Sequence, residues 1–228
     1  MHRVVQRVRQ SVLHGKAVVA TTDHPRDVPI VEWCERANVD CFRGSESDVL
    51  ARYRHAAVAH DADVVVRVTS DCPLLDPYLL DLTIRAHLER NADYLAFERL
   101  PAGIAQETFS RACLERSFRE ARLAEEREHV IYYAINHPEI FKVIFLDPPH
   151  DLELPHWRLT LDTEADYALM TGLYEVTHRA AAKMPVGEII AVVRSHPDLL
   201  RLAEGPPATK FVSTADQVVR EVDVVASK

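Results

Sequence analysis

Two neighbouring segments decide the fold, FRGSESDVL at residues 42–50 and VVVRVTSDCP at residues 64–73. A helical run separates them, so together they predict one βαβ unit. The valines of the second segment are β-branched and apolar, which predicts a central strand of a parallel sheet. Asp71 follows that strand, two residues before a proline that cannot continue a strand ladder.

Asp71 therefore lies at the carboxyl end of a predicted strand. In open α/β sheets, ligands bind beyond these strand ends. A carboxylate near the loop Arg43-Gly44-Ser45 indicates a phosphate ligand that carries a metal ion. The alternative is that Asp71 only orders the turn Ser70-Asp71-Cys72-Pro73, and spacing alone leaves the two interpretations open.

The composition excludes several classes of protein. The chain has 228 residues, a net charge of −8 and 47% hydrophobic residues, which suits one α/β domain without a basic surface for nucleic acids. No apolar run reaches the roughly 20 residues of a membrane span, and no leader of signal-peptide type is present. The four cysteines form no C-x-x-C pair, which favours reduced thiols in a cytoplasmic protein.

Strand and helix patterns alternate along the chain, which predicts a doubly wound parallel sheet with helices on both faces. We expect one domain over residues 1–204, and a linker with a short, helical tail over 205–228. The predicted strands are 16–22, 39–42, 63–69, 93–97, 141–146 and 157–161. The predicted helices are 4–13, 27–37, 47–60, 77–90, 110–123, 125–136, 163–178, 186–195 and 197–203.

A second acidic strand end occurs in WRLTLDTEAD at residues 157–166. Thr163 and Asp166 have the spacing of a capping box. Asp162 and Asp71, at neighbouring strand ends, are suited to hold one Mg²⁺, which prefers oxygen ligands and keeps waters and substrate phosphates in its shell. The alternative is that Asp162 or Thr163 only caps the following helix.

Three further segments carry weaker signals. Arg43-Gly44-Ser45 suits a phosphate or a base carbonyl, or is simply a tight turn before a helix. Glu107 is able to bind the hydroxyls of a polyol, or only favours a helix N-terminus. Arg127 and His129 lie in a charged helix whose face we expect to be solvated.

Five segments, in order, resemble the spore-coat polysaccharide biosynthesis branch of the cytidylyltransferases, which is related to the enzymes that activate acylneuraminate and 3-deoxy-manno-octulosonate. They are Phe42–Tyr53, Val66–Pro77, Glu126–Val130, Asn136–Glu139 and Leu159–Asp166.

The resemblance implies a Rossmann-like nucleotide-diphospho-sugar transferase fold with a mostly parallel sheet. It also implies transfer of CMP from CTP to a sugar or sugar acid, with release of pyrophosphate, in surface polysaccharide synthesis. A homodimer that contacts through residues 103–136 is a further implication. The roles it implies are Mg²⁺ binding by Asp71 and Asp162, nucleotide binding by Thr21, Thr22, Arg43, Gly44 and Ser45, and acceptor binding by Glu107, Arg127 and His129.

One part of the family pattern has no counterpart here, the first strand and the loop A-R-x-G-S-x-R-L-P-G-K. We therefore expect an exposed sheet neighbour at residues 16–22, and turnover only where the loop is restored. The competing hypothesis is a non-catalytic module for interaction or nucleotide sensing. A glycosyltransferase with a D-x-D metal site ranks lower, because Asp61-Ala62-Asp63 precedes its strand.

Overall fold

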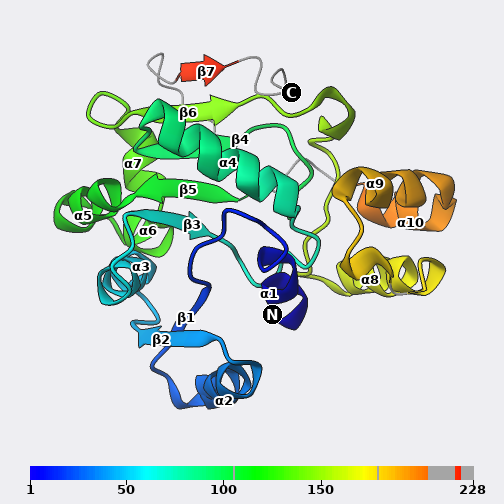
Figure 1. Cartoon of the computed structure of the whole chain (residues 1–228), viewed down its shortest axis with the longest axis horizontal. Helices are drawn as coiled ribbons and strands as arrows, with labels where there is room; N and C mark the ends of the chain where they lie inside the picture. The colour runs from blue at the N-terminus through cyan, green and yellow to red at the C-terminus, as the bar shows by residue number, and fades with distance from the viewer. Residues whose placement is uncertain (105, 179, 205–218, 222–228) are drawn as a thin grey trace.

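The computed structural model describes residues 1–104, 106–178, 180–204 and 219–221. In this part of the chain the strands form two separate sheets (Figure 1). A parallel pair consists of β1 (Val18–Thr22) and β2 (Asp40–Gly44). The larger sheet has the order β3-β5-β4-β6-β7, with β3 (Val64–Arg67), β4 (Tyr94–Phe97), β5 (Glu107–Ser110), β6 (Val143–Leu146) and β7 (Val219–Glu221).

Helices cover both faces of the larger sheet because its strands alternate between two cores. Leu95 and Phe97 of β4 face a core with α4 and α8–α10, whereas Tyr94 and Ala96 face a core with α3, α5 and α7. The helices are α1 (His2–Val8), α2 (Val28–Ala37), α3 (Val49–Ala59), α4 (Pro77–Arg90), α5 (Arg111–Glu120), α6 (Ala124–Glu128), α7 (Tyr132–Asn136), α8 (Glu164–Val176), α9 (Val186–Ser195) and α10 (Pro197–Ala203). The α/β class with helices on both faces is confirmed, but the larger sheet is mixed, because β5 runs antiparallel to both β3 and β4.

The strand β3 lies at the edge of the larger sheet and not at its centre. Among the described residues it pairs only with β5, and the pairing is antiparallel. The expectation of a central strand is wrong here, because in the described part of the chain no strand lies between β3 and β1 to join the two sheets (Figure 1). The open neighbour expected at residues 16–22 is confirmed, since β1 pairs only with β2 within the described part.

Two helices connect the sheets from opposite sides. Val4 of α1 packs with α4, which covers the larger sheet, whereas Val5 packs with Cys34 of α2 beside the β1–β2 pair. On the other side, α3 contacts β1 and β2 as well as α5. The buried Arg7 fixes α1 further, because it donates hydrogen bonds to the carbonyl groups of Leu75, Ala181 and Met184.

Several predicted elements differ from the observed ones. The antiparallel strand β5 was not predicted, because its sequence ETFS has a single apolar residue and so carries no strand pattern. Residues 157–161 form no strand, since their backbone N–H groups bond to several segments, including Ala203, Ala102 and Asp71, in place of one partner strand. The first helix ends at Val8, which leaves Val12 81% exposed.

The helix predicted over residues 125–136 is two short helices, α6 and α7. The helix predicted in the tail falls mostly outside the described residues, and Val219–Glu221 form a strand beside β6. The boundary at residue 204 stays a prediction. None of the helices in the described ranges is long and apolar enough to cross a membrane.

Candidate active site

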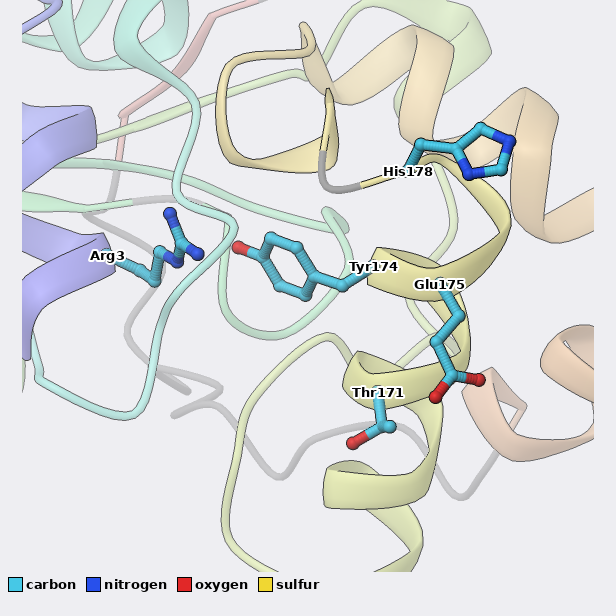
Figure 2. Close-up of a pocket in the computed structure, with 5 residues that line it drawn as sticks. All are labelled: Arg3, Thr171, Tyr174, Glu175 and His178. Carbon is cyan, nitrogen blue, oxygen red and sulfur yellow. The ribbon is translucent and has the colours of Figure 1, made fainter.

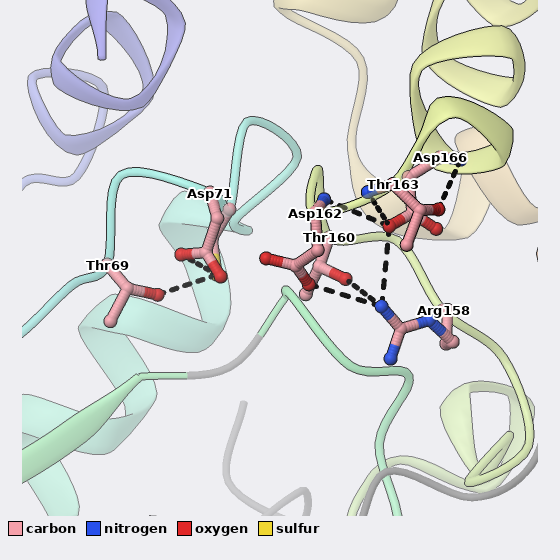
Figure 3. A network of polar contacts seen from close by, with 8 residues as sticks. Thr69, Asp71, Arg158, Thr160, Asp162, Thr163 and Asp166 are labelled. Carbon is pink, nitrogen blue, oxygen red and sulfur yellow. Dashed lines mark hydrogen bonds and ion pairs between the residues drawn. The ribbon is translucent and has the colours of Figure 1, made fainter. Parts of the chain in front are cut away.

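Asp71 and Asp162 are brought together at the carboxyl end of β3. The N–H of Leu161 donates to the carbonyl of Asp71 at 2.8 Å, which joins the loop after β3 to the segment before α8. Figure 3 shows the two carboxylates facing each other across this junction. The sequence expectation that these carboxylates are neighbours agrees with this arrangement, although Asp162 follows a loop and not a strand.

A polar network holds Asp162 in place. Arg158 Nη2 lies 3.1 Å from the carboxylate of Asp162 and 3.3 Å from that of Asp166 (Figure 3). Asp166 is buried and accepts the N–H groups of Asp162 and Thr163, while the Thr163 hydroxyl accepts the N–H of Asp166. This is the capping box that the sequence predicts. Because Asp166 supplies the carboxylate that caps α8, the Asp162 carboxylate is not needed for the cap and can bind a ligand.

The facing carboxylates fit a magnesium ion that substrate helps to hold. In the described residues, no cluster of three or more histidine, cysteine, aspartate or glutamate side chains is suited to bind a metal alone. Mg²⁺ is commonly held by one or two carboxylates together with waters and substrate phosphates. Asp71 and Asp162 supply that number of oxygen ligands.

Thr21 and Thr22, at the end of β1, both form hydrogen bonds with the Asp27 carboxylate. Both hydroxyls donate to Asp27 Oδ2, at 2.7 and 2.6 Å, and the N–H of Thr22 donates to the same oxygen. These hydrogen bonds lower the pKa of Asp27 to about 2. The hydroxyl oxygens keep lone pairs that a ligand donor can use.

Arg43 and Ser45 fix the loop after β2. Arg43 is exposed and donates to the carbonyl groups of Thr22 and His24, which ties the ends of β1 and β2 together. The Ser45 hydroxyl accepts the N–H of Asp48 at 3.0 Å, as expected for a residue before a helix. At Gly44, an added Cβ would lie 3.2 Å from side-chain atoms of neighbouring residues, so the site is tight.

Glu107 lies at the same edge but has a partner that the sequence did not suggest. It begins β5, opposite the last residue of β3, and accepts a hydrogen bond from Arg67 Nη1 at 2.8 Å. Its side chain is 15% exposed. Glu107 therefore lies in a strand and not at the start of a helix, and the helix N-terminus interpretation is wrong.

Arg127 connects two parts of the fold, so the expectation that it lies on a solvated helix face is wrong. It forms an ion pair with Asp48, donates to the carbonyl of Phe118, and stacks on the Phe118 ring at 4.7 Å. Asp48 in turn caps α3 through the N–H of Ala51. The pair joins α6 to the start of α3, beside the Ser45 loop. His129 is exposed and stacks on a tyrosine ring 4.3 Å away.

The structure adds residues that sequence reasoning missed. Arg67, Asp27, Asp48 and Arg158 each bind a predicted site residue directly. Arg67 carried a signal, because it is the one charged residue inside the apolar run VVVRV. Asp27, Asp48 and Arg158 carried no such sequence signal, because the packing of loops determines which residues they bind.

A separate pocket of about 540 Å³ lies between α1 and α8 (Figure 2). Its lining includes Arg3, whose guanidinium lies 5.1 Å from the centre of the Tyr174 ring. None of the predicted site residues lines this pocket. It is therefore distinct from the edge where Asp71 and Asp162 meet.

Comparison with known proteins identifies the family. A family model described as cytidylyltransferase matches residues 1–181. The spore coat polysaccharide biosynthesis protein SpsF of Bacillus subtilis is 35% identical over 202 residues, which are 86% of this chain and 83% of the relative. An uncharacterized protein of Methanocaldococcus jannaschii, MJ1063, is 34% identical over 196 residues, which are 86% of this chain and 80% of the relative.

Solved structures agree. A cytidylyltransferase from Leptospira borgpetersenii superposes with a TM-score of 0.80 at 28% identity, over 91% of this chain and 87% of that one. A CMP:2-keto-3-deoxy-manno-octonic acid synthetase complexed with CTP shares the fold, with a TM-score of 0.53 at 11% identity over 78% and 87% of the two chains. The chain belongs to the cytidylyltransferase family and is a nucleotidyltransferase.

Proposed function

We propose that this enzyme transfers CMP from CTP to a hydroxyl of a sugar or sugar acid, with release of pyrophosphate, in the synthesis of a surface polysaccharide. The observation that carries the proposal is the pair of facing carboxylates, Asp71 and Asp162, at the carboxyl end of β3. Support also comes from the names of two similar proteins, the spore coat polysaccharide biosynthesis protein SpsF and the synthetase that was solved with CTP.

In this proposal Asp71 and Asp162 hold Mg²⁺. When bound, the ion would neutralise charge on the phosphates of CTP. Arg158 keeps the Asp162 carboxylate in place. A bond forms between the acceptor oxygen and the α-phosphorus, the bond from that phosphorus to the β-phosphate oxygen breaks, and the acceptor proton passes to solvent.

The carboxyl ends of β1 and β2, with Ser45 just after β2, would bind the nucleotide. Thr21, Thr22, Arg43, Gly44 and Ser45 lie at the carboxyl ends of this parallel pair, where ligands of α/β sheets bind. Arg43 is exposed and bonds only to backbone carbonyl groups among the described residues, so its guanidinium has donors left for a phosphate or base.

The acceptor side would be formed by Glu107, Arg127 and His129. In the structure Glu107 and Arg127 each already bind an oppositely charged partner. Their role as acceptor ligands, the homodimer and the cytoplasmic location stay predictions, and nothing found among the relatives supports the non-catalytic alternative.

The test measures pyrophosphate release from CTP in a chain to which the family's N-terminal loop has been restored, with Asp71→Asn, Asp162→Asn and the matched control Asp61→Asn. Asp61 has a side chain that is 94% exposed and pairs with Arg111 away from the site. We expect the first two variants to lose release and the control to keep it. Release that is unchanged in Asp71→Asn and Asp162→Asn would remove these residues from the site.

A further inference from the structure

The ion pair between Arg67 and Glu107 lies at the edge where the active site is proposed. Arg67 ends β3, four residues before Asp71, and the antiparallel register places Glu107 of β5 directly opposite it. Their side chains therefore share one face of the sheet. The Nη1 to Oε2 distance is 2.8 Å, and the two side chains are 27% and 15% exposed.

Arg67 stays charged although it is partly buried. Burial lowers the pKa of Arg67, but Glu107 and Tyr53 raise it more, so the net direction is upward. Burial also raises the pKa of Tyr53, which Arg67 opposes. The Arg67 Nε is buried without a hydrogen-bond partner in the described residues, and Glu107 Oε1 accepts no hydrogen bond there. Glu107 Oε1 thus keeps unused hydrogen-bonding capacity, whereas the buried Nε of Arg67 is closed to a ligand.

The second arginine of the proposed acceptor side is neutralised in the same way. Arg127 forms its ion pair with Asp48, and the side chains are 22% and 28% exposed. Each of these two arginines therefore has a carboxylate of its own. At this side of the site, positive charge and negative charge cancel.

The proposed nucleotide side, at the end of β2 and the start of α3, differs from the acceptor side. Arg43 donates to backbone carbonyl groups, and so does Arg52, which bonds to Ser45. Neither has a carboxylate at ion-pair distance within the described part of the chain. Positive charge without a paired carboxylate is thus found on the nucleotide side, where an anionic ligand is expected.

We propose that the CMP acceptor is a neutral, hydroxyl-rich sugar and not a sugar acid, and that Arg67 and Glu107 determine this choice. The inference rests on the proposed function. A sugar hydroxyl can donate to Glu107 Oε1 and accept from Arg67 without disturbing the pair. A carboxylate on the acceptor would have to displace Glu107 from Arg67, which leaves a partly buried carboxylate without its partner.

The test is binding of matched sugars, measured by saturation-transfer NMR on the full chain with Mg²⁺ and α,β-methylene CTP, which cannot react. The probes are glucose with glucuronic acid, and galactose with galacturonic acid, because each pair differs only at C6. We expect the neutral member to bind roughly tenfold more tightly, which corresponds to one charged hydrogen bond. In Glu107→Gln this preference disappears or reverses, because Arg67 becomes free to bind the acid.

The matched control is Glu115→Gln. Glu115 pairs with Arg54 at 3.0 Å with side chains 28% and 27% exposed, so it is a similar ion pair between α3 and α5. This variant should keep the wild-type preference, and circular dichroism checks that both variants fold. Equal or tighter binding of the acids by the wild type, or an unchanged preference in Glu107→Gln, overturns the inference. Binding of the CTP analogue with no detectable binding of any of the four sugars also overturns it, whereas failure to bind the analogue overturns the proposed function itself.

Discussion

Replacement of Asp166 by asparagine tests the network that positions Asp162. Asp166 is 3% exposed and accepts the N–H groups of Asp162 at 2.9 Å and Thr163 at 3.0 Å, and Arg158 at 3.3 Å. An asparagine still accepts the two N–H groups, but without charge. A charged hydrogen bond contributes about 1.5–3 kcal/mol and a neutral one about 0.5–1.5 kcal/mol. With the Arg158 contact weakened as well, we expect a loss of about 2–3 kcal/mol in the free energy of unfolding at pH 7.

The same variant has a defined pH dependence. Burial pushes the pKa of Asp166 upward, but the N–H donors and Arg158 together hold it below its ordinary value. A lowered pKa means that the stabilisation is complete above the unfolded pKa of about 3.9 and is lost as the pH falls through the folded pKa. The difference between wild type and Asp166→Asn should therefore persist from pH 8 to pH 5 and shrink below about pH 4.

Urea unfolding followed by circular dichroism measures both effects. Glu164→Gln is the control, because Glu164 lies exposed in the same first turn of α8 and should change stability by less than about 0.5 kcal/mol. A loss below about 0.5 kcal/mol in Asp166→Asn, or a loss that does not change with pH, would refute the role given to this carboxylate.

Three more predictions concern stability. Arg7→Met should cost about 3 kcal/mol or more in urea unfolding, because three carbonyl groups lose their buried donor, whereas the exposed Arg9→Met should cost little. Asp27→Asn should flatten the acid limb of the stability curve between about pH 4 and pH 2, because the pKa of Asp27 is lowered to about 2. Gly103→Ala should lower the thermal midpoint, because the φ of Gly103 is +97° and a Cβ would lie 2.6 Å from the Leu159 carbonyl oxygen. The first prediction fails if Arg7→Met and Arg9→Met cost the same. The second fails if Asp27→Asn leaves the fall in stability at acid pH unchanged, and the third if Gly103→Ala leaves the thermal midpoint unchanged.

Local sequence patterns predicted most elements of the fold. The helix α4 matches residue for residue, since Asp76 caps it and Pro77 begins it. The Thr163–Asp166 capping box was also predicted, because both of its partners lie within one helical turn. Signals of this kind depend only on residues that are close in sequence.

Features that depend on distant segments were not predicted. The valines of β3 have the pattern of a strand buried on both faces, yet the sequence alone does not show which strands will be its neighbours. The partner of Glu107 depends on an antiparallel strand of four residues, and that of Arg127 lies 79 positions away. For the site, the sequence indicated which residues carry charge at the strand ends, but not which charges are already paired.

The central claim is tested most directly by calorimetry of CTP binding to the 228-residue chain, with and without Mg²⁺, with ATP as the control nucleotide. We expect binding that needs Mg²⁺, that prefers CTP over ATP, and that weakens by roughly tenfold or more in Asp71→Asn, because one charged ligand is lost. Binding of CTP that is independent of Mg²⁺ and unchanged in Asp71→Asn, or equal binding of ATP, would contradict it.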